Sequence, residues 1–87
     1  MEKTLTIENK TGLHARPASM FVQTANKFKA KIKLTAKGKT VDAKSILMIM
    51  SLGLQQGTDV TINAEGDDAQ DALAALTDLI KSKFGED

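Results

Sequence analysis

Apolar residues recur along this chain with two different spacings, and the order of those spacings limits the possible folds. In KAKIKLTA (29–36), Ala30, Ile32 and Leu34 occupy alternate positions, and lysines fill most of the places between them. A period of two indicates a β-strand with one buried face and, here, a basic outer face. The same period predicts further strands in KTLTIEN (3–9), TVDA (40–43) and TDVTINAEG (58–66).

Helical spacing appears between these strands. Ala18, Phe21, Val22 and Ala25 follow the i, i+3, i+4, i+7 pattern of an amphipathic helix, which predicts a helix from about residue 15 to residue 27. KSILMIMSLG (44–53) is expected to contain a short helix with Ser45 as its N-cap.

The last segment, DDAQDALAALTDLIKSKF (67–84), has the clearest helical pattern. Its apolar stripe comprises Ala69, Leu73, Leu76, Ile80 and Phe84. Asp67 with Gln70 resembles a capping box, and Gly85 is expected to end the helix.

The predicted order is therefore βαββαβα, and four short strands with one-faced helices indicate an α+β two-layer sandwich. A chain of 87 residues fits one domain, residues 1–87. Without cysteine, it has no disulfide and no thiolate metal site. No apolar run approaches the roughly 20 residues that span a bilayer. The start, MEKTLTIENK, lacks an apolar signal core, so we expect a cytoplasmic protein without membrane insertion.

The only histidine lies in TGLHARPASM (11–20), immediately before a predicted helix. A helix N-terminus presents free N–H groups and partial positive charge, which suit an anion such as phosphate. Arg16 adds a guanidinium group that matches phosphate oxygens, and Pro17 suits the first turn of a helix. Neutral imidazole is a nucleophile near pH 7. His14, Arg16 and the backbone N–H of Ala15 therefore predict a site that accepts a phosphoryl group.

Other chemistry at His14 fits less well. The chain offers no second histidine or cysteine as a metal ligand, and no carboxylate lies close to His14 in the sequence, so we expect no metal and no cofactor. No acid or base is paired with His14 in the sequence as a hydrolase would need, although pairing in space stays open.

GLHARPAS (12–19) followed by KSILMIMSLGLQQG (44–57) resembles HPr, the histidine-containing phosphocarrier family of the bacterial phosphoenolpyruvate:sugar phosphotransferase system. The resemblance covers the whole chain and implies an open-faced sandwich, four antiparallel strands covered on one face by three helices. It implies that His14 accepts a phosphoryl group on Nδ1 from phosphorylated Enzyme I, whose own donor is phosphoenolpyruvate. His14 would pass that group to the IIA domain of a sugar-specific Enzyme II. The protein would then be a carrier, not a turnover enzyme, and a monomer.

The short helix is more apolar than packing on a sheet requires. If Ile49 and Leu52 face the core, other apolar residues on this helix face outward, and such clusters mark partner sites. Partner docking is expected at Met20, Ile46, Leu47 and Met50, while the side of Met48 is open. In the resembling family, this short helix and the active-site helix form the shared surface for Enzyme I and the IIA domains.

Ser45 has a structural reading and a regulatory one. An N-cap serine needs no other role. In the HPr of many low-GC Gram-positive bacteria, however, an HPr kinase/phosphorylase phosphorylates the serine at this position, and the product partners a catabolite-control regulator. The serine permits this regulation without establishing it.

Charged residues are unevenly distributed along the chain, and the basic first half suggests one alternative class of function. Residues 1–44 hold ten Lys and Arg against three Asp and Glu, whereas residues 45–87 hold two against eight. A basic nucleic-acid-binding α+β module is the alternative. Such a module needs exposed aromatic side chains for stacking, and Phe21, Phe28 and Phe84 each have a plausible core position. We therefore expect no nucleic-acid partner, and a purely structural protein would leave His14 and Arg16 unexplained.

Overall fold

The computed structural model describes residues 1–86. Within them, the strands are β1 (Glu2–Thr6), β2 (Lys31–Ala36), β3 (Lys39–Asp42) and β4 (Asp59–Glu65). The helices are α1 (Ala15–Ala25), α2 (Ile46–Ser51) and α3 (Ala69–Lys81), followed by a 3₁₀ turn, η1 (Lys83–Gly85). The order predicted from the sequence is confirmed.

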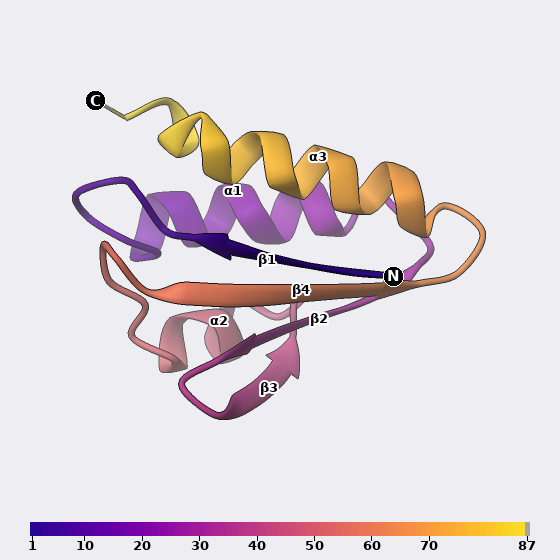
Figure 1. Cartoon of the computed structure of the whole chain (residues 1–87), viewed down its shortest axis with the longest axis horizontal. Coiled ribbons are helices and arrows are strands. Elements are labelled where there is room, and N and C mark those ends of the chain that lie inside the picture. The colour runs from indigo at the N-terminus through magenta and orange to yellow at the C-terminus, as the bar shows by residue number, and fades with distance from the viewer. Residues whose placement is uncertain (87) are drawn as a thin grey trace.

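The strands form an antiparallel sheet in the order β1-β4-β2-β3, so that the last strand lies between the first and the second (Figure 1). A row of threonines crosses this sheet. Thr61 of β4 is opposite Thr4 of β1 on one side and Thr35 of β2 on the other. Thr35 is in turn opposite Thr40 of β3. Opposite residues share a face of the sheet, so this row marks the face that the helices leave open.

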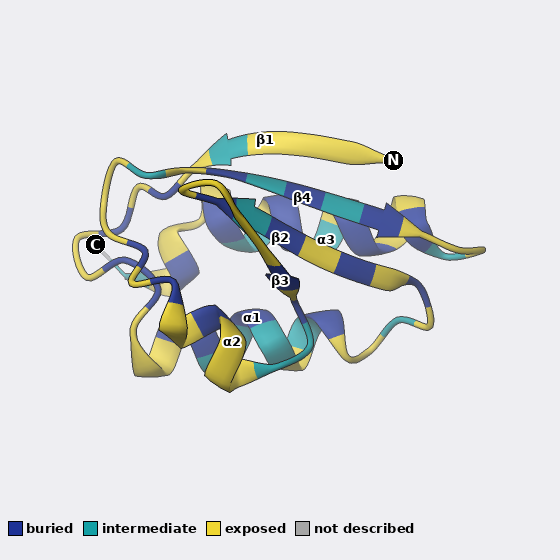
Figure 2. Cartoon of the chain, turned by 90° about the horizontal axis from the view of Figure 1, so that it is seen from below, coloured by how far each residue is buried: buried dark blue, intermediate teal, exposed yellow. Residues whose placement is uncertain are grey.

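The helices pack on the other face and bury its apolar side chains. α3 contacts β1 and β4, α2 contacts β3, and α1 contacts both other helices. Figure 2 shows the alternation along β2, where Ile32 and Leu34 are buried and Lys31 and Lys33 are exposed. The largest fully buried side chains include Phe21, Phe84, Ile32, Leu34, Ile62 and Leu76. The two-layer α+β sandwich is therefore confirmed.

The element bounds differ slightly from the predicted ones. α1 ends at Ala25 rather than near residue 27, and β1 ends at Thr6 rather than at residue 9. Ile7 nevertheless continues the pairing, because its N–H donates to the Thr58 carbonyl at 2.9 Å and its carbonyl accepts from the Gly57 N–H at 2.7 Å. Ile7 is therefore buried although it lies outside the strand.

The predicted helix over 67–84 is interrupted before Phe84. Regular helix ends at Lys81, and Phe84 has a φ of 56°, in the left-handed region. The turn still buries Phe84 in the core, where the apolar stripe predicted it. Among residues 1–86, no helix is both long enough and apolar enough to span a membrane.

The predicted capping box at Asp67 is wrong. The N-cap of α3 is Asp68, and its carboxylate makes no capping bond to the helix. It accepts instead from the backbone N–H groups of Lys29 and Ala30, both at 2.8 Å. Asp68 thereby ties the start of α3 to the segment that leads into β2. These two bonds, the one from Lys29 first, lower the pKa of Asp68.

Candidate functional site

His14 is the N-cap of α1, and its side chain is exposed. Its backbone is extended, with φ −88° and ψ −163°, and its carbonyl accepts from the Ala18 N–H at 2.8 Å. N-cap side chains usually accept a bond from the first turn, but the His14 imidazole makes no such bond. Both imidazole nitrogens therefore remain available for chemistry outside the helix.

The first turn of α1 presents donors beside His14. Among residues 1–86, no acceptor pairs with the backbone N–H groups of Ala15 and Arg16. Pro17 follows, which has no N–H and is buried against the fold. The helix therefore begins with two unpaired N–H groups and the positive end of its dipole next to the imidazole, an arrangement that favours an anion.

Gly12 holds the loop before His14 against the segment that follows α2. Its φ is +64°, and a Cβ on Gly12 would overlap the carbonyl oxygen of Leu54. The same carbonyl accepts from the Leu13 N–H at 3.0 Å. Sequence reasoning missed this role, although a glycine two residues before a functional side chain is a signal for close backbone approach.

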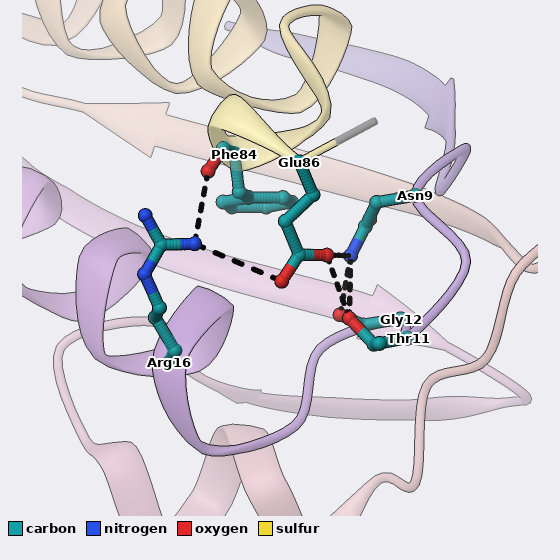
Figure 3. A network of polar contacts seen from close by, with 6 residues as sticks. All are labelled: Asn9, Thr11, Gly12, Arg16, Phe84 and Glu86. Atoms are coloured by element: carbon teal, nitrogen blue, oxygen red, sulfur yellow. Dashed lines mark hydrogen bonds and ion pairs between the residues drawn. The ribbon is translucent and has the colours of Figure 1, made fainter.

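A buried asparagine joins this loop to the C-terminal segment (Figure 3). Asn9 is fully buried, and its Nδ2 donates to the Gly12 carbonyl at 2.7 Å and to Glu86 Oε1 at 3.0 Å. The Thr11 hydroxyl donates to the same carboxylate oxygen at 2.7 Å. Residue 86 is 77 positions from Asn9, so no local pattern in the sequence could predict this contact.

The other oxygen of Glu86 faces Arg16. Arg16 Nη1 lies 3.7 Å from Glu86 Oε2 and 3.5 Å from the Phe84 carbonyl oxygen. Both contacts are long and use the same nitrogen (Figure 3). The Arg16 side chain is 63% exposed, so the ion pair is screened and weak. Arg16 is therefore held only loosely beside His14.

The pKa of Glu86 is lowered by this surrounding. The hydrogen bond from the Thr11 hydroxyl contributes most, followed by the one from Asn9, and the charges of His14 and Arg16 contribute less. Glu86 thus remains ionised at neutral pH. It supplies a carboxylate near His14 that the sequence order did not reveal.

The exposed apolar residues of α2 form a second surface, which we call the α2 patch: Ile46, Leu47, Met48 and Met50. The predicted division of this helix is confirmed, because Ile49 and Leu52 are buried. Met48, whose side the sequence left open, is exposed. Met20 of α1 is half-buried against the core, and α1 contacts α2.

Ser45 is the N-cap of α2, as predicted. Its Oγ accepts from the Met48 N–H at 3.4 Å, and the residue is half-buried. Ser45 therefore stands at the start of the α2 patch.

The structure offers little for the alternative chemistries. Among residues 1–86, no three His, Cys, Asp or Glu side chains are grouped closely enough to hold a metal ion. Phe21 and Phe84 are fully buried and Phe28 is half-buried, so the fold presents no aromatic platform for nucleic acid. A nucleic-acid-binding module is not favoured.

Comparison with known proteins places these features in a family context. A family model described as the PTS HPr component phosphorylation site matches residues 1–82. HPr-C-His from Thermoanaerobacter tengcongensis is 59% identical, with a TM-score of 0.97, over 100% of this chain and 98% of that one. The phosphocarrier protein HPr from Bacillus anthracis is 49% identical, with a TM-score of 0.89, over 92% and 95% of the two chains. An HPr dimer from T. tengcongensis is also similar, with 59% identity, a TM-score of 0.81 and 99% coverage of both chains.

Proposed function

This chain belongs to the HPr phosphocarrier family of the phosphotransferase system, and we propose that His14 is the residue on which it carries the phosphoryl group. Members of this family are phosphocarriers, not turnover enzymes. We propose Enzyme I, charged by phosphoenolpyruvate, as the donor and the IIA domain of a sugar-specific Enzyme II as the acceptor. The observation that carries the proposal is the exposed, unbonded imidazole at the N-cap of α1.

The transfer needs a free nitrogen lone pair at His14 and groups that stabilise the negative charge of the phosphoryl oxygens. We propose transfer between two histidines, so that the donor on Enzyme I is a phosphohistidine. The Nδ1 lone pair of His14 forms the new N–P bond while the bond between phosphorus and the donor imidazole breaks, and that imidazole leaves with the electron pair. Catalysis of phosphoryl transfer is mostly positioning and charge stabilisation. The unpaired N–H groups of Ala15 and Arg16 support this role, because both lie beside the imidazole. Pro17 helps to start the helix that aligns them.

We assign the guanidinium of Arg16 to the phosphoryl oxygens. In the unphosphorylated protein, Nη1 is the only guanidinium nitrogen with a polar contact within residues 1–86; it contacts Glu86 and the Phe84 carbonyl, and both contacts are long. A doubly charged phosphoryl group on His14 would compete favourably with them, because charge-assisted bonds to phosphate are short and often bidentate. Arg16 would therefore turn from Glu86 to the phosphoryl group and return when that group leaves.

Intact-mass measurement and phosphorus NMR test this function directly. The chain is mixed with Enzyme I and phosphoenolpyruvate, beside a His14→Ala variant. One acid-labile phosphate on the wild type, absent from the variant, is the expected result. If Enzyme I charges another HPr but leaves this chain unmodified, the carrier function is wrong.

For docking, we propose that Enzyme I and the IIA domains share one surface composed of Met20, Ile46, Leu47 and Met50. The exposure of the α2 residues supports this surface, as does the contact between α1 and α2. Flexible methionines suit a surface that must accept more than one partner. Met48 is exposed on the same short helix, and we add it to the surface.

We further propose that phosphorylation of Ser45, by an HPr kinase/phosphorylase, regulates docking and creates a form that binds a catabolite-control regulator. Its place at the start of the α2 patch supports this, because a phosphate there adds charge next to an apolar contact. Ser45→Asp places a negative charge at this position and should slow phosphoryl transfer from Enzyme I. Ser45→Ala adds no charge and should not slow it. Equal rates for both variants would contradict the proposal.

We propose that the chain works as a cytoplasmic monomer. A monomer would leave both His14 and the α2 patch accessible to Enzyme I and the IIA domains, as the proposed function requires. Light scattering of the purified chain tests it, and a dimer, as in the T. tengcongensis structure, is the contrary result.

A further inference from the structure

A basic hollow lies on the sheet near the start of β2, and it has no part in the function proposed above. Its volume is about 460 Å³, and four lysines line it, Lys29, Lys31, Lys33 and Lys44. β3 pairs with β2 from Lys33 onward, and Ala43, which follows β3, donates its N–H to the Ile32 carbonyl at 3.0 Å, so only Lys31 of β2 is paired with β4 alone. The hollow therefore lies beside the end of β3, whose residues Thr40, Val41 and Asp42 also line it.

The lysines of the hollow carry positive charge, and within residues 1–86 none of them forms an ion pair. Lys31 and Lys33 alternate along β2, so their Cα atoms are about 6.6 Å apart at the usual rise of 3.3 Å per residue, and Lys29 lies in the segment just before the strand. Among residues 1–86, no carboxylate lies within 4.0 Å of any of these ammonium groups. The lysine charges therefore repel one another, which lowers the stability of the fold, and a bound anion would reduce this repulsion.

Three acidic groups of the described residues lie near the hollow. One of them, Asp68, accepts from the backbone N–H groups of Lys29 and Ala30, both at 2.8 Å. These bonds, the one from Lys29 first, and the charge of Lys44 lower its pKa. Within residues 1–86, Asp42 is the only carboxylate that lines the hollow; its Oδ1 accepts from the backbone N–H of Lys44 at 2.9 Å, and the residue is opposite Lys33 in the sheet. Glu65 is opposite Lys31 on β4 but makes no ion pair with it.

One lysine is already fixed in place. Lys44 is half-buried, and its Nζ donates to the Phe28 carbonyl at 2.7 Å. This bond holds the ammonium at the wall of the hollow and leaves two of its three donors for a ligand. Ile32 and Val41 also line the hollow but are only 2% and 7% exposed, so its accessible apolar surface comes chiefly from the methylene stems of the lysines.

We propose that this hollow binds a small organic molecule carrying two phosphate groups. Ligand sites typically have volumes of about 300–1,000 Å³, so the hollow can hold more than one phosphate. Lys31 and Lys33 on β2 would bind one phosphate group and Lys44 the other, and the carbon skeleton between the two phosphates would lie along the lysine stems.

This site is distinct from the His14 site. His14 is at the N-terminal end of α1, whereas the hollow begins at Lys29, beyond its C-terminal end (Figure 1). The 11 residues of α1 span about 16 Å. Lys44, however, directly precedes Ser45, the N-cap of α2. A ligand in the hollow would therefore lie next to the helix that carries the α2 patch.

Amide NMR of the full chain, titrated with glucose 1,6-bisphosphate at about 0.1 M salt, where exposed charges are screened beyond about 10 Å, tests this proposal. We expect saturable shifts confined to residues 29–33 and 40–45. The double variant Lys31→Gln with Lys33→Gln should bind about tenfold more weakly, since each lost charge contact weakens the complex. The control, Lys3→Gln with Lys81→Gln, removes two exposed lysines from β1 and α3 and should bind as the wild type does.

Three outcomes would overturn the proposal. Shifts that spread over all lysines without saturation would mean general charge attraction. Equal weakening in both double variants would mean that net charge, and not the hollow, matters. Sulfate at the same ionic strength reproducing the shifts with equal affinity would show that the hollow does not recognise a bisphosphate. Thermal melting of both double variants checks that they are folded. We expect melting temperatures close to that of the wild type, because all four substituted lysines are exposed.

Discussion

Two N-cap residues of this chain use the same backbone position in different ways. The Ser45 hydroxyl accepts a bond from its own helix, as N-cap residues usually do. The His14 imidazole makes no such bond. A helix that forgoes the stabilising cap, worth about 1 kcal/mol, keeps a nucleophile free and a set of donors unpaired beside it. The role proposed for His14 in phosphoryl transfer would account for the missing cap.

Gly12→Ala should lower the free energy of unfolding by more than about 2 kcal/mol, because a left-handed backbone costs about 1–2 kcal/mol and the new Cβ also overlaps Leu54. Gly53→Ala is the matched control. Gly53 has a φ of +59°, close to the +64° of Gly12, but its Cβ would meet nothing within 4 Å. Urea unfolding of both variants separates strain from overlap, and equal losses would refute the role assigned to the close approach.

Glu86→Gln should change how stability depends on pH. The pKa of Glu86 is lowered in the folded chain, chiefly by the hydrogen bonds from Thr11 and Asn9. Such a carboxyl stabilises the fold above its unfolded pKa, about 4.3, and this contribution is lost as the pH falls through the folded pKa. Urea unfolding should therefore show wild type more stable than Glu86→Gln at pH 7, with the difference closing below about pH 4. Glu2→Gln, an exposed control outside this network, should show a smaller pH-dependent difference. A gap that stays constant with pH would contradict the argument.

Helices and strands whose apolar residues repeat with a single spacing could be predicted from the sequence. Breaks of the backbone within such a repeat could not. β2 and β4 alternate strictly, and α1 repeats helically, so each was found within a few residues. The break before Phe84 is different, because the left-handed turn leaves the apolar spacing intact while changing the backbone.

Local spacing likewise brought His14 and Arg16 together, since both lie at the start of one helix. Their link to Glu86 was not predictable, because it depends on how α3 and η1 pack over α1. The capping box failed for the same reason: Asp68 is engaged by backbone donors that are distant in sequence.

Asp68→Ala tests how the elements are linked. This change removes the acceptor of the Lys29 and Ala30 N–H groups, so both amides should exchange with solvent more than about tenfold faster, as local opening becomes easier. Asp67→Ala, at the neighbouring exposed position, should leave both amides protected. A capping box at Asp67 would instead require Asp67→Ala to speed the exchange of the Gln70 amide, because the N-cap side chain of such a box binds the N3 N–H. Hydrogen-exchange NMR at single-residue resolution decides between them.

The uneven distribution of charge along the sequence corresponds to a difference in charge between the two layers of the fold, with exposed lysines on the sheet and exposed aspartates on the helices. Lys31 and Lys33 are exposed on the open face of the sheet, whereas Asp71 and Asp78 are exposed on α3 in the helical layer. The α2 patch belongs to the same layer as α3 but consists of apolar side chains. A partner can therefore be oriented by charge and held by apolar contact, two effects that act separately.

Leu47 and Ile49 are two residues apart on α2 and should separate docking from folding. Leu47 is 79% exposed, so Leu47→Ala should leave the melting temperature unchanged. It should lower kcat/KM for transfer from Enzyme I about tenfold, if it behaves as an interface residue worth about 1.4 kcal/mol. Ile49 is fully buried, and Ile49→Ala should cost about 2–5 kcal/mol of stability. At a temperature where Ile49→Ala is still folded, its transfer should be impaired less than that of Leu47→Ala. If both variants lose stability and transfer in proportion, α2 acts only through the fold and the α2 patch is not a docking surface.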